Sequence, residues 1–215
     1  MFSKLFPKIH AEGYKFLIIA GIITIVFYSF SDFFGLIGFV LTIWVYYFFR
    51  DPERVIIGDD NYLVSPADGE IIKVEEVDGP KELGLDNKKF QKISVFMNVF
   101  DCHVNRSPCG GKIEEILYKP GKFLNASFDK ASEDNERNYF KIKDNQNNDV
   151  IVVQIAGLVA RRIVCESSKD QQLNQGDRIG MIRFGSRADV FYENYQPLVK
   201  IGQKAISGET LLAKK

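Results

Sequence analysis

The apolar residues of the chain are concentrated near its N-terminus. Residues 14–49 contain only two charged side chains, Lys15 and Asp32. Asp32 separates two uncharged arms, residues 16–30 and 33–49, and each arm is slightly shorter than the roughly 20 residues of a straight membrane-spanning helix. A carboxylate is costly at the centre of a bilayer but acceptable at a turn near its surface. The pattern therefore predicts a transmembrane or membrane-embedded helical hairpin that turns near Asp32.

Basic residues flank this apolar stretch on both sides, with Lys4, Lys8 and Lys15 before it and Arg50 and Arg54 after it. Lys and Arg are enriched in the cytoplasmic loops of membrane proteins, so both ends of the hairpin are predicted to face the cytoplasm. A secretory signal sequence and a hairpin buried in a protein core are the alternatives. No small-residue cleavage pattern follows the first arm and a second apolar arm does, which favours an uncleaved anchor.

After Arg50 the pattern changes to short apolar or alternating runs bounded by Gly, Pro, Asn or Asp, which is typical of strands. The polar stretch 132–148 is predicted to be a loop around one short strand, 139–142. The chain is thus predicted to consist of an N-terminal arm and hairpin, residues 1–50, and a mainly β domain, residues 51–215. Seven strands are predicted in that domain, at 69–75, 92–100, 112–117, 148–155, 161–166, 177–183 and 189–192.

Two segments of the β domain resemble each other, because in both a Gly-containing turn leads into a strand. They are residues 65–74 and 175–182. Such turns recur in hammerhead-like or barrel-sandwich-like β domains, including lipoyl and biotinyl carriers, and this is the fold class that we predict. A carrier needs a Lys at the tip of a hairpin and a phosphocarrier needs paired His, and the sequence has neither feature in a convincing form.

Composition excludes several classes of function. The 28 Lys and Arg balance the 28 Asp and Glu, so the chain as a whole is not attracted to nucleic acid. The three Cys form no CxxC pair and there are only two His, so neither a zinc site nor a disulfide framework is predicted, and no other metal is implied. A length of 215 residues suits one medium-sized domain with an appendage.

Three positions are candidates for chemistry. His103 follows a predicted strand, and its titration near neutral pH suits acid–base work, although a lone His is more often structural. Asp68 lies in a predicted turn that its side chain could equally well cap. The dipeptide Gly185-Ser186 could be an ordinary turn, but Gly also lets a neighbouring hydroxyl approach the backbone closely. From the residues alone, these alternatives stay open.

The segment RFGSRADV at residues 183–190 resembles the short form of the phosphatidylserine decarboxylase proenzymes. Further segments agree with that family in the same order, so that the resemblance covers nearly all of residues 49–213. They are FRDPER at 49–54, SPADG at 65–69, FMNVFDCHVNRSP at 96–108, YKPGKFLNA at 118–126, ASEDNERN at 131–138, QIAGLVARR at 154–162, IGQ at 201–203 and SGET at 207–210.

The resemblance implies a lyase that is made as a self-cleaving zymogen. The Ser186 hydroxyl would attack the Gly185 carbonyl, and the chain would separate into a large chain, 1–185, and a small chain, 186–215, which stay together as a heterodimer. Ser186 would become a covalently bound pyruvoyl group that forms a Schiff base with phosphatidylserine and accepts electrons as carbon dioxide leaves. The product would be phosphatidylethanolamine, made at the cell membrane by a domain that faces the cytoplasm. Higher oligomers stay open.

The chain departs from the family pattern at one position. Longer members carry two His, and His103 matches the one that serves decarboxylation, whereas Arg106 stands where a relay His would assist cleavage. A guanidinium stays protonated and cannot act as that base. The resemblance therefore implies His103 as the proton donor in decarboxylation. For cleavage three possibilities stay open: Asp68 assists it, His103 serves both steps, or backbone strain reduces the need for a base.

Three arginines, Arg161, Arg162 and Arg187, are candidates for binding the phosphodiester or the carboxylate of the substrate, because a guanidinium fork suits such oxygens. Ordinary salt bridges are the competing interpretation for all three. Two other functions also stay open. One is a membrane-tethered, non-catalytic hammerhead carrier or binding module, and the other is a pyruvoyl decarboxylase of a soluble amino acid, which would leave the apolar anchor unexplained.

Overall fold

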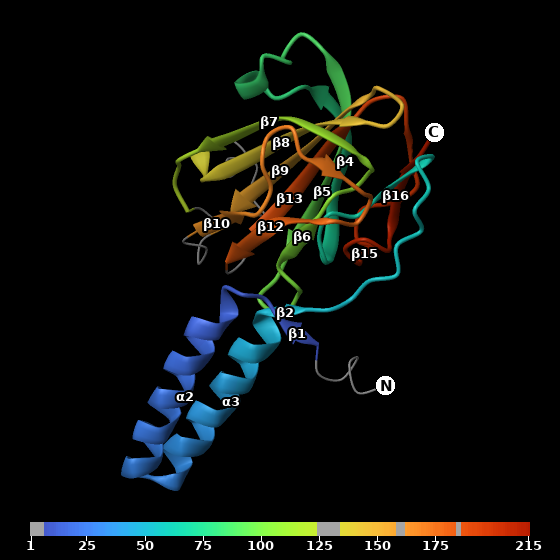
Figure 1. The fold of residues 1–215 in the computed structure, drawn as a ribbon. Coiled ribbons are helices and arrows are strands. Elements are labelled where there is room, and N and C mark those ends of the chain that lie inside the picture. The colour runs from blue at the N-terminus through green and yellow to red at the C-terminus, as the bar shows by residue number, and fades with distance from the viewer. Residues whose placement is uncertain (1–6, 124–133, 158–161, 184–185) are drawn as a thin grey trace. The chain divides into compact units, whose positions relative to one another are not determined.

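A computed structural model describes residues 7–123, 134–157, 162–183 and 186–215 (Figure 1). The chain forms two compact units, Met1–Glu53 and Arg54–Lys215. The first unit contains two apolar helices, and the second consists mostly of strands. The prediction of a mainly β fold with an apolar N-terminal hairpin is confirmed.

The hairpin consists of α2, Gly13–Phe30, and α3, Asp32–Phe48, with Ser31 between them. Ser31 has extended backbone angles, and its hydroxyl accepts a hydrogen bond from the Phe33 amide at 3.2 Å, which caps α3. Asp32 occupies the first turn of α3, where the helix dipole favours a negative charge. The turn therefore lies next to the residue at which the sequence predicts it. At the end of the hairpin opposite its turn, β1, Lys8–Ile9, pairs with β2, Arg50–Asp51.

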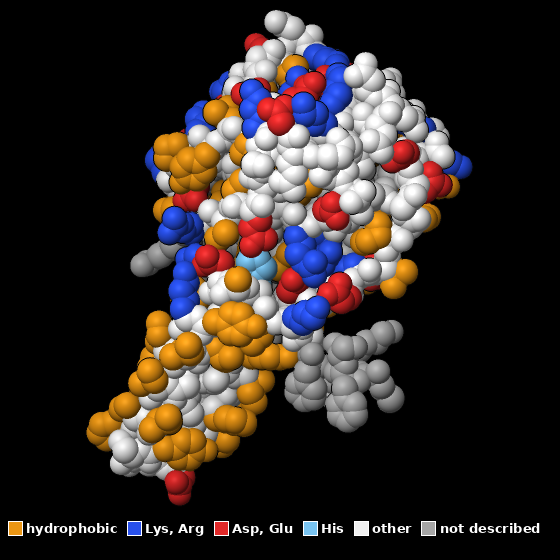
Figure 2. All heavy atoms as spheres, viewed as in Figure 1, with side chains coloured by type: hydrophobic (Ala, Val, Ile, Leu, Met, Phe, Trp, Pro, Cys, Tyr) orange, Lys and Arg blue, Asp and Glu red, His pale blue; other side chains and the backbone are white. Residues whose placement is uncertain are grey.

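Small residues bring the two helices together. A Cβ atom added to Gly38 would lie 3.0 Å from the Thr24 Cα atom, and the Thr24 and Thr42 hydroxyls are 2.9 Å apart. Many of the large apolar side chains point outward instead, so that hydrophobic atoms cover much of the visible hairpin surface (Figure 2). By length and composition, α2 is able to cross a membrane, whereas α3 is one residue shorter.

The β unit is built on an eight-stranded antiparallel sheet in the order β11-β7-β8-β9-β13-β5-β4-β15 (Figure 1). The central strand β13 pairs with β9 on one side and β5 on the other, over seven residue pairs each. The strands are β4, Gly69–Asp78; β5, Lys89–Met97; β7, Gly111–Lys119; β8, Arg137–Asp144; β9, Asp149–Ala156; β11, Gln172–Leu173; β13, Ser186–Tyr192; and β15, Lys204–Ala205.

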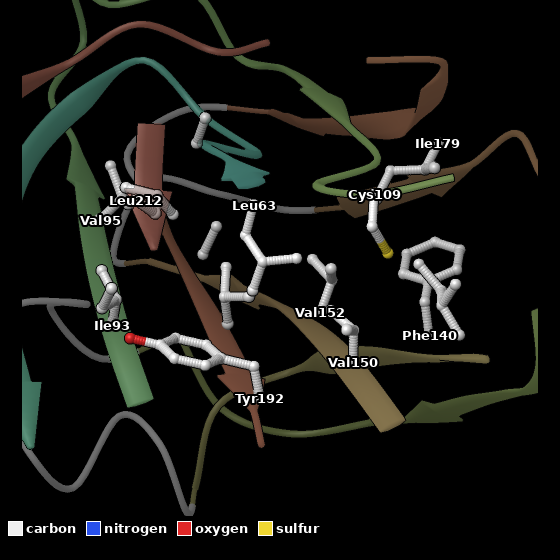
Figure 3. Close-up of a cluster of buried hydrophobic side chains, with 14 of the residues drawn as sticks. Leu63, Ile93, Val95, Cys109, Phe140, Val150, Val152, Ile179, Tyr192 and Leu212 are labelled. Carbon is white, nitrogen blue, oxygen red and sulfur yellow. The ribbon is translucent and has the colours of Figure 1, made fainter. Parts of the chain in front are cut away.

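Two three-stranded sheets pack on one face of this sheet, which makes the unit a sandwich. Apolar side chains such as Leu63, Ile179 and Leu212 meet Val152 and Tyr192 of the large sheet in one core (Figure 3). The first small sheet contains β10, Arg162–Cys165, β12, Arg178–Arg183, and β6, Val104–Arg106; the second contains β14, Gln196–Pro197, β16, Leu211–Lys214, and β3, Tyr62–Val64.

The opposite face of the large sheet carries a smaller apolar cluster that includes Phe90, Tyr139 and Val153. Leu83, at the end of the short helix η1, Lys81–Leu83, packs against it. Because side chains alternate along a strand, Ser186 and Ala188 share the face of the main core, whereas Arg187, Asp189 and Phe191 lie on the face of the smaller cluster.

Each of the seven predicted strands has a counterpart in the structure, with shifted ends. The short strand predicted at 139–142 is present but longer than predicted, because β8 extends over eight residues and pairs along both edges. Its first residues, Arg137 and Asn138, are polar but buried, with partners in Glu82 and Gln154. Local polarity therefore hides the beginning of a strand whose first side chains are buried against polar partners.

Candidate active site

The predicted cleavage point lies where the chain passes from one sheet to another. Strand β12 ends at Arg183 in the sheet of β10 and β6, and β13 begins at Ser186 in the large sheet. Gly185 itself lies outside the described residues. The chain before the cleavage point and the chain after it are thus held by different neighbouring strands.

Ser186 is completely buried at the start of β13. It lies between Met97 of β5 and Ala156 of β9 in the sheet register. Its hydroxyl oxygen is 3.6 Å from the Met97 Sδ atom. A thioether is a weak acceptor, so the hydroxyl sits in a dry setting rather than in a strong hydrogen bond.

His103 lies in the loop that joins β5 to β6 and is completely buried. This loop connects Met97, the partner of Ser186, with Val104, the partner of Met181 in β12. The His103 carbonyl also accepts the Ile182 amide at 3.2 Å. The loop is therefore attached to the strands on both sides of the predicted cleavage point.

The imidazole of His103 is oriented by its own loop. Its Nδ1 atom is 3.0 Å from the Asp101 carbonyl oxygen. A carbonyl oxygen can only accept, so Nδ1 carries a proton and Nε2 is the atom that can gain or lose a second one. The Asp101 carboxylate in turn accepts the Asn98 amide at 2.8 Å, which fixes the loop.

Asp68 is part of an ion pair with Arg54. The Arg54 Nη2 atom lies 2.8 and 2.7 Å from the two carboxylate oxygens, and the Ser207 amide donates to Oδ1 at 2.8 Å. Burial alone would lower the pKa of Arg54, but the attraction of Asp68 outweighs it and the pKa is raised. Arg106, at the relay-His position, donates from Nη1 to the Gly176 carbonyl at 3.0 Å.

The structure separates the three candidate arginines. Arg161 lies outside the described residues, and Arg162 begins β10 with an exposed side chain. Arg187 is completely buried and pairs with Asp189, with 2.8 Å between Nε and Oδ1. Since Arg187 is on the face of the sheet opposite to Ser186, the structure does not bring these two side chains together.

Three buried amide side chains next to Ser186 were not predicted from the sequence: Asn105, Gln154 and Asn138. Asn105 Nδ2 lies 3.6 Å from the same Met97 sulfur atom that contacts Ser186. Gln154 and Asn138 extend this contact across β9 and β8. A usable signal was present, because Gln154 is in phase with the core residues Val150 and Val152 of its strand.

Comparison with known proteins settles the family. The family model described as phosphatidylserine decarboxylase matches residues 41–213. The chain belongs to this family. Members are decarboxylases that depend on a pyruvoyl group, so family membership favours the enzyme over the non-catalytic carrier.

Three relatives named "Phosphatidylserine decarboxylase proenzyme" support this assignment. The protein of Pelagibacter ubique is 76% identical over 215 residues, which is 100% of both chains. That of Ruegeria pomeroyi is 53% identical over 95% of this chain and 94% of its own length. That of Cereibacter sphaeroides is 50% identical over 99% and 92%, respectively. The resemblance noted in the sequence is confirmed.

Proposed function

We propose that this chain is the proenzyme of a membrane-bound phosphatidylserine decarboxylase that cuts itself between Gly185 and Ser186. The observation that carries the proposal is the position of Ser186. It is a buried hydroxyl at the point where the chain leaves one sheet and enters another, within the family segment RFGSR.

In the proposed cleavage, the Ser186 oxygen attacks the Gly185 carbonyl carbon and the peptide C–N bond breaks. The hydroxyl proton passes to the released nitrogen, which leaves an ester. Loss of the Ser186 Cα proton then expels the Gly185 carboxylate and leaves dehydroalanine. Addition of water and departure of ammonia convert this group into a pyruvoyl group. His103 is our candidate for the proton transfers, because its Nε2 atom is titratable and its loop contacts both flanking strands.

The two products of cleavage are expected to stay together as a heterodimer. In the small chain, β13 has paired neighbours on both sides, and β15 and β16 pair with β4 and β3 of the large chain. The severed ends need no shared peptide bond, since β12 is held separately by β10 and β6.

The surroundings of residue 186 fit a pyruvoyl group, because Met97 and Ala188 are fully buried and exclude water there. When present, the group supplies a carbonyl that reacts with the substrate amine and accepts the electron pair left by carbon dioxide. A dry site favours loss of a carboxylate whose charge is then dispersed. We assign His103 to deliver the proton that replaces carbon dioxide.

We assign the hairpin to anchor the enzyme on the cytoplasmic side of the cell membrane, where a diacyl substrate resides. Arg161 and Arg162 are our candidates for the phosphodiester. For Arg187 we now propose a structural role, because it is paired with Asp189 away from Ser186. Asp68 would support cleavage indirectly, by fixing the turn at 65–69.

Release of labelled carbon dioxide tests this function. Carboxyl-labelled phosphatidylserine in vesicles and free carboxyl-labelled serine are offered as substrates in separate assays. The lipid should be turned over and free serine should not. Equal turnover of both would favour the alternative of a decarboxylase for a soluble amino acid. If the cleaved protein turned over neither substrate, the proposal would be contradicted.

A further inference from the structure

A continuous file of amide side chains leads through the core to Ser186. Asn138 Nδ2 donates to Gln154 Oε1 at 3.2 Å, and Gln154 Nε2 donates to Asn105 Oδ1 at 2.9 Å. Asn105 Nδ2 then lies 3.6 Å from Met97 Sδ, which is itself 3.6 Å from the Ser186 oxygen. We call Asn138, Gln154 and Asn105 the carboxamide file.

The file lies in an otherwise apolar part of the core. Asn105 and Gln154 are completely buried and Asn138 is 1% exposed. Their strand neighbours on the same face, Phe140 and Val152, belong to the main apolar cluster. Buried amides are tolerated only when their hydrogen bonds are made, and apolar residues of similar size would usually pack there at least as well. Stability of the sandwich therefore does not explain why three amides occur here.

The direction of the file is fixed at one end. Asn105 Nδ2 also lies 3.4 Å from the Pro66 carbonyl oxygen, which can only accept. This places the nitrogen of Asn105 toward Pro66 and Met97 and its oxygen toward Gln154. Gln154 must then present its own nitrogen to Asn105 and its oxygen to Asn138. All three N–H ends thus point toward the Ser186 side, and aligned hydrogen bonds polarise one another.

We infer that the carboxamide file is a positioning device for self-cleavage, which holds Met97 against the Ser186 hydroxyl and directs a positive potential toward the Ser186 oxygen. This inference rests on the proposed function. As Ser186 gives up its proton to attack, negative charge develops on its oxygen, which lies 3.6 Å from Met97 Sδ, and dipoles aligned toward such charge in a dry core stabilise it. Neutral amides do so without placing an unpaired charge in the core of the proenzyme before cleavage begins.

The substitution Gln154→Glu tests the file with almost no change in shape. A carboxylate cannot donate to Asn105 Oδ1, so Asn105 must turn its nitrogen away from Met97 or leave a repulsive contact. We expect self-cleavage to slow at least about tenfold at pH 7.5. It is measured in cell-free synthesis with labelled Met, since all three Met residues belong to the large chain. The rate is the conversion of the 24.5 kDa chain to fragment 1–185.

A pH series separates this role from mere packing. Burial raises the pKa of a carboxyl group, so acidification should protonate the introduced side chain and restore its ability to donate. Cleavage by Gln154→Glu should then recover between pH 7.5 and 5.5, relative to the unsubstituted chain at each pH, whereas Gln154→Leu should stay slow. Loss of packing alone would give two flat, parallel profiles and would overturn the inference.

Gln175 provides a matched control. It is also buried, and its Nε2 atom donates to the Tyr62 carbonyl at 2.7 Å, where it holds a loop rather than the Ser186 strand. Gln175→Glu should lower thermal stability but leave the cleavage rate within about twofold. A tenfold slower cleavage in this control would contradict a specific role for the file.

If Gln154→Glu fails to fold, Met97→Leu decides. This swap conserves volume and is well tolerated in cores, but it removes the sulfur between Asn105 and Ser186. Cleavage slowed severalfold would support the inference, and an unchanged rate would overturn it. The proposed function fails separately, if the unsubstituted chain does not cleave or if Ser186→Ala still does.

Discussion

The segment 186–215 is held at its two ends by different kinds of side-chain contact. Ser186, at the beginning, contacts the Met97 thioether, which in turn contacts the uncharged carboxamide file. At the other end, Lys215 Nζ lies 3.3 Å from Asp144 Oδ2, and the hydroxyl of Tyr195, which stands earlier in the segment, donates to the same oxygen at 2.8 Å. Neutral groups surround the reacting end, and charged groups hold the far end.

The difference indicates a division of labour. Uncharged amides can orient a hydroxyl, and they interact strongly with a charge only once it forms during the reaction. An ion pair attracts its partner in every state of the protein. Asp144 belongs to the predicted large chain, whereas Lys215 and Tyr195 belong to the predicted small chain. Burial alone would raise the pKa of Asp144, but hydrogen bonds from Asn148 and Tyr195 outweigh burial and lower the pKa. This end is thus a tether across the two chains.

Breaking the reacting end should have the largest effect. Ser186→Ala removes the nucleophile, so we expect the chain to stay intact and decarboxylation to be lost, with thermal stability nearly unchanged. Electrophoresis and carbon dioxide release measure both results. Ser94→Ala, at an equally buried serine of β5, is the control and should cleave normally. Cleavage of the Ser186→Ala chain would refute the assignment of the nucleophile.

The second largest effect is expected at His103. Loss of a positioned proton donor typically slows a reaction about 10²–10⁴-fold, so His103→Gln should slow self-cleavage by that factor. In the fraction that does cleave, kcat on phosphatidylserine, counted per cleaved chain, should fall to a similar extent. His10→Gln is the control at the other His of the chain and should retain kcat. If the cleaved His103→Gln enzyme keeps full kcat, another group delivers the proton.

Breaking the contact between Asp144 and Lys215 should lower the stability of the protein but not its rate of self-cleavage. Asp144→Asn leaves Lys215 with no buried counter-ion, and we expect a loss of about 1–3 kcal/mol in the free energy of unfolding with an unchanged cleavage rate. Urea denaturation of the cleaved protein measures the loss. Asp170→Asn removes an exposed partner of Lys112 and should cost clearly less stability than Asp144→Asn. Equal losses in the two variants would show that the tether is no stronger than a surface pair.

Acid should weaken the same tether. The pKa of Asp144 is lower in the folded protein than the value of about 3.9 in an unfolded chain. Its contribution to stability is therefore complete above the unfolded pKa and is lost as the pH falls through the folded pKa. The urea midpoint of the cleaved protein should drop more steeply below about pH 4 than that of Asp144→Asn. If the urea midpoints of the two proteins fell equally with pH, Asp144 would not contribute to the loss of stability in acid.

The comparison of the two ends also shows how far sequence reasoning reaches. Apolar patterns located strands such as β5 and β9. In β5 the core positions 93, 95 and 97 are apolar at every second residue, and β9 contains the continuous apolar run 150–153. Asn138 and Arg137 concealed only the beginning of β8, since each is a polar residue that is buried against a polar partner on another element. A local pattern records the polarity of a residue and not its partner.

The candidate site was predicted to a similar extent. Segment resemblance located Ser186 and His103, and the structure adds how the β5–β6 loop attaches His103 to both flanking strands. The pairing of Asp68 with Arg54 and the orientation of Arg187 could not be predicted, because both depend on which face of the sheet a side chain occupies and on contacts between strands. The tether to Asp144 is likewise a long-range contact.

The smallest effect is predicted for Arg162, the described candidate for binding the substrate phosphodiester. Arg162 is exposed at the start of β10, so Arg162→Gln should remove a charge-assisted contact to the phosphodiester and raise KM for phosphatidylserine by about tenfold or less, without changing kcat. Lys169→Gln, at another exposed cation, is the control. An unchanged KM would place the phosphodiester elsewhere.

Mass analysis of the purified, denatured protein tests the central claim most directly. The account predicts two polypeptides, residues 1–185 and 186–215, with the smaller one lighter than a Ser-initiated peptide by one ammonia and reactive toward carbonyl reagents. A single intact chain that nevertheless decarboxylates phosphatidylserine would contradict it.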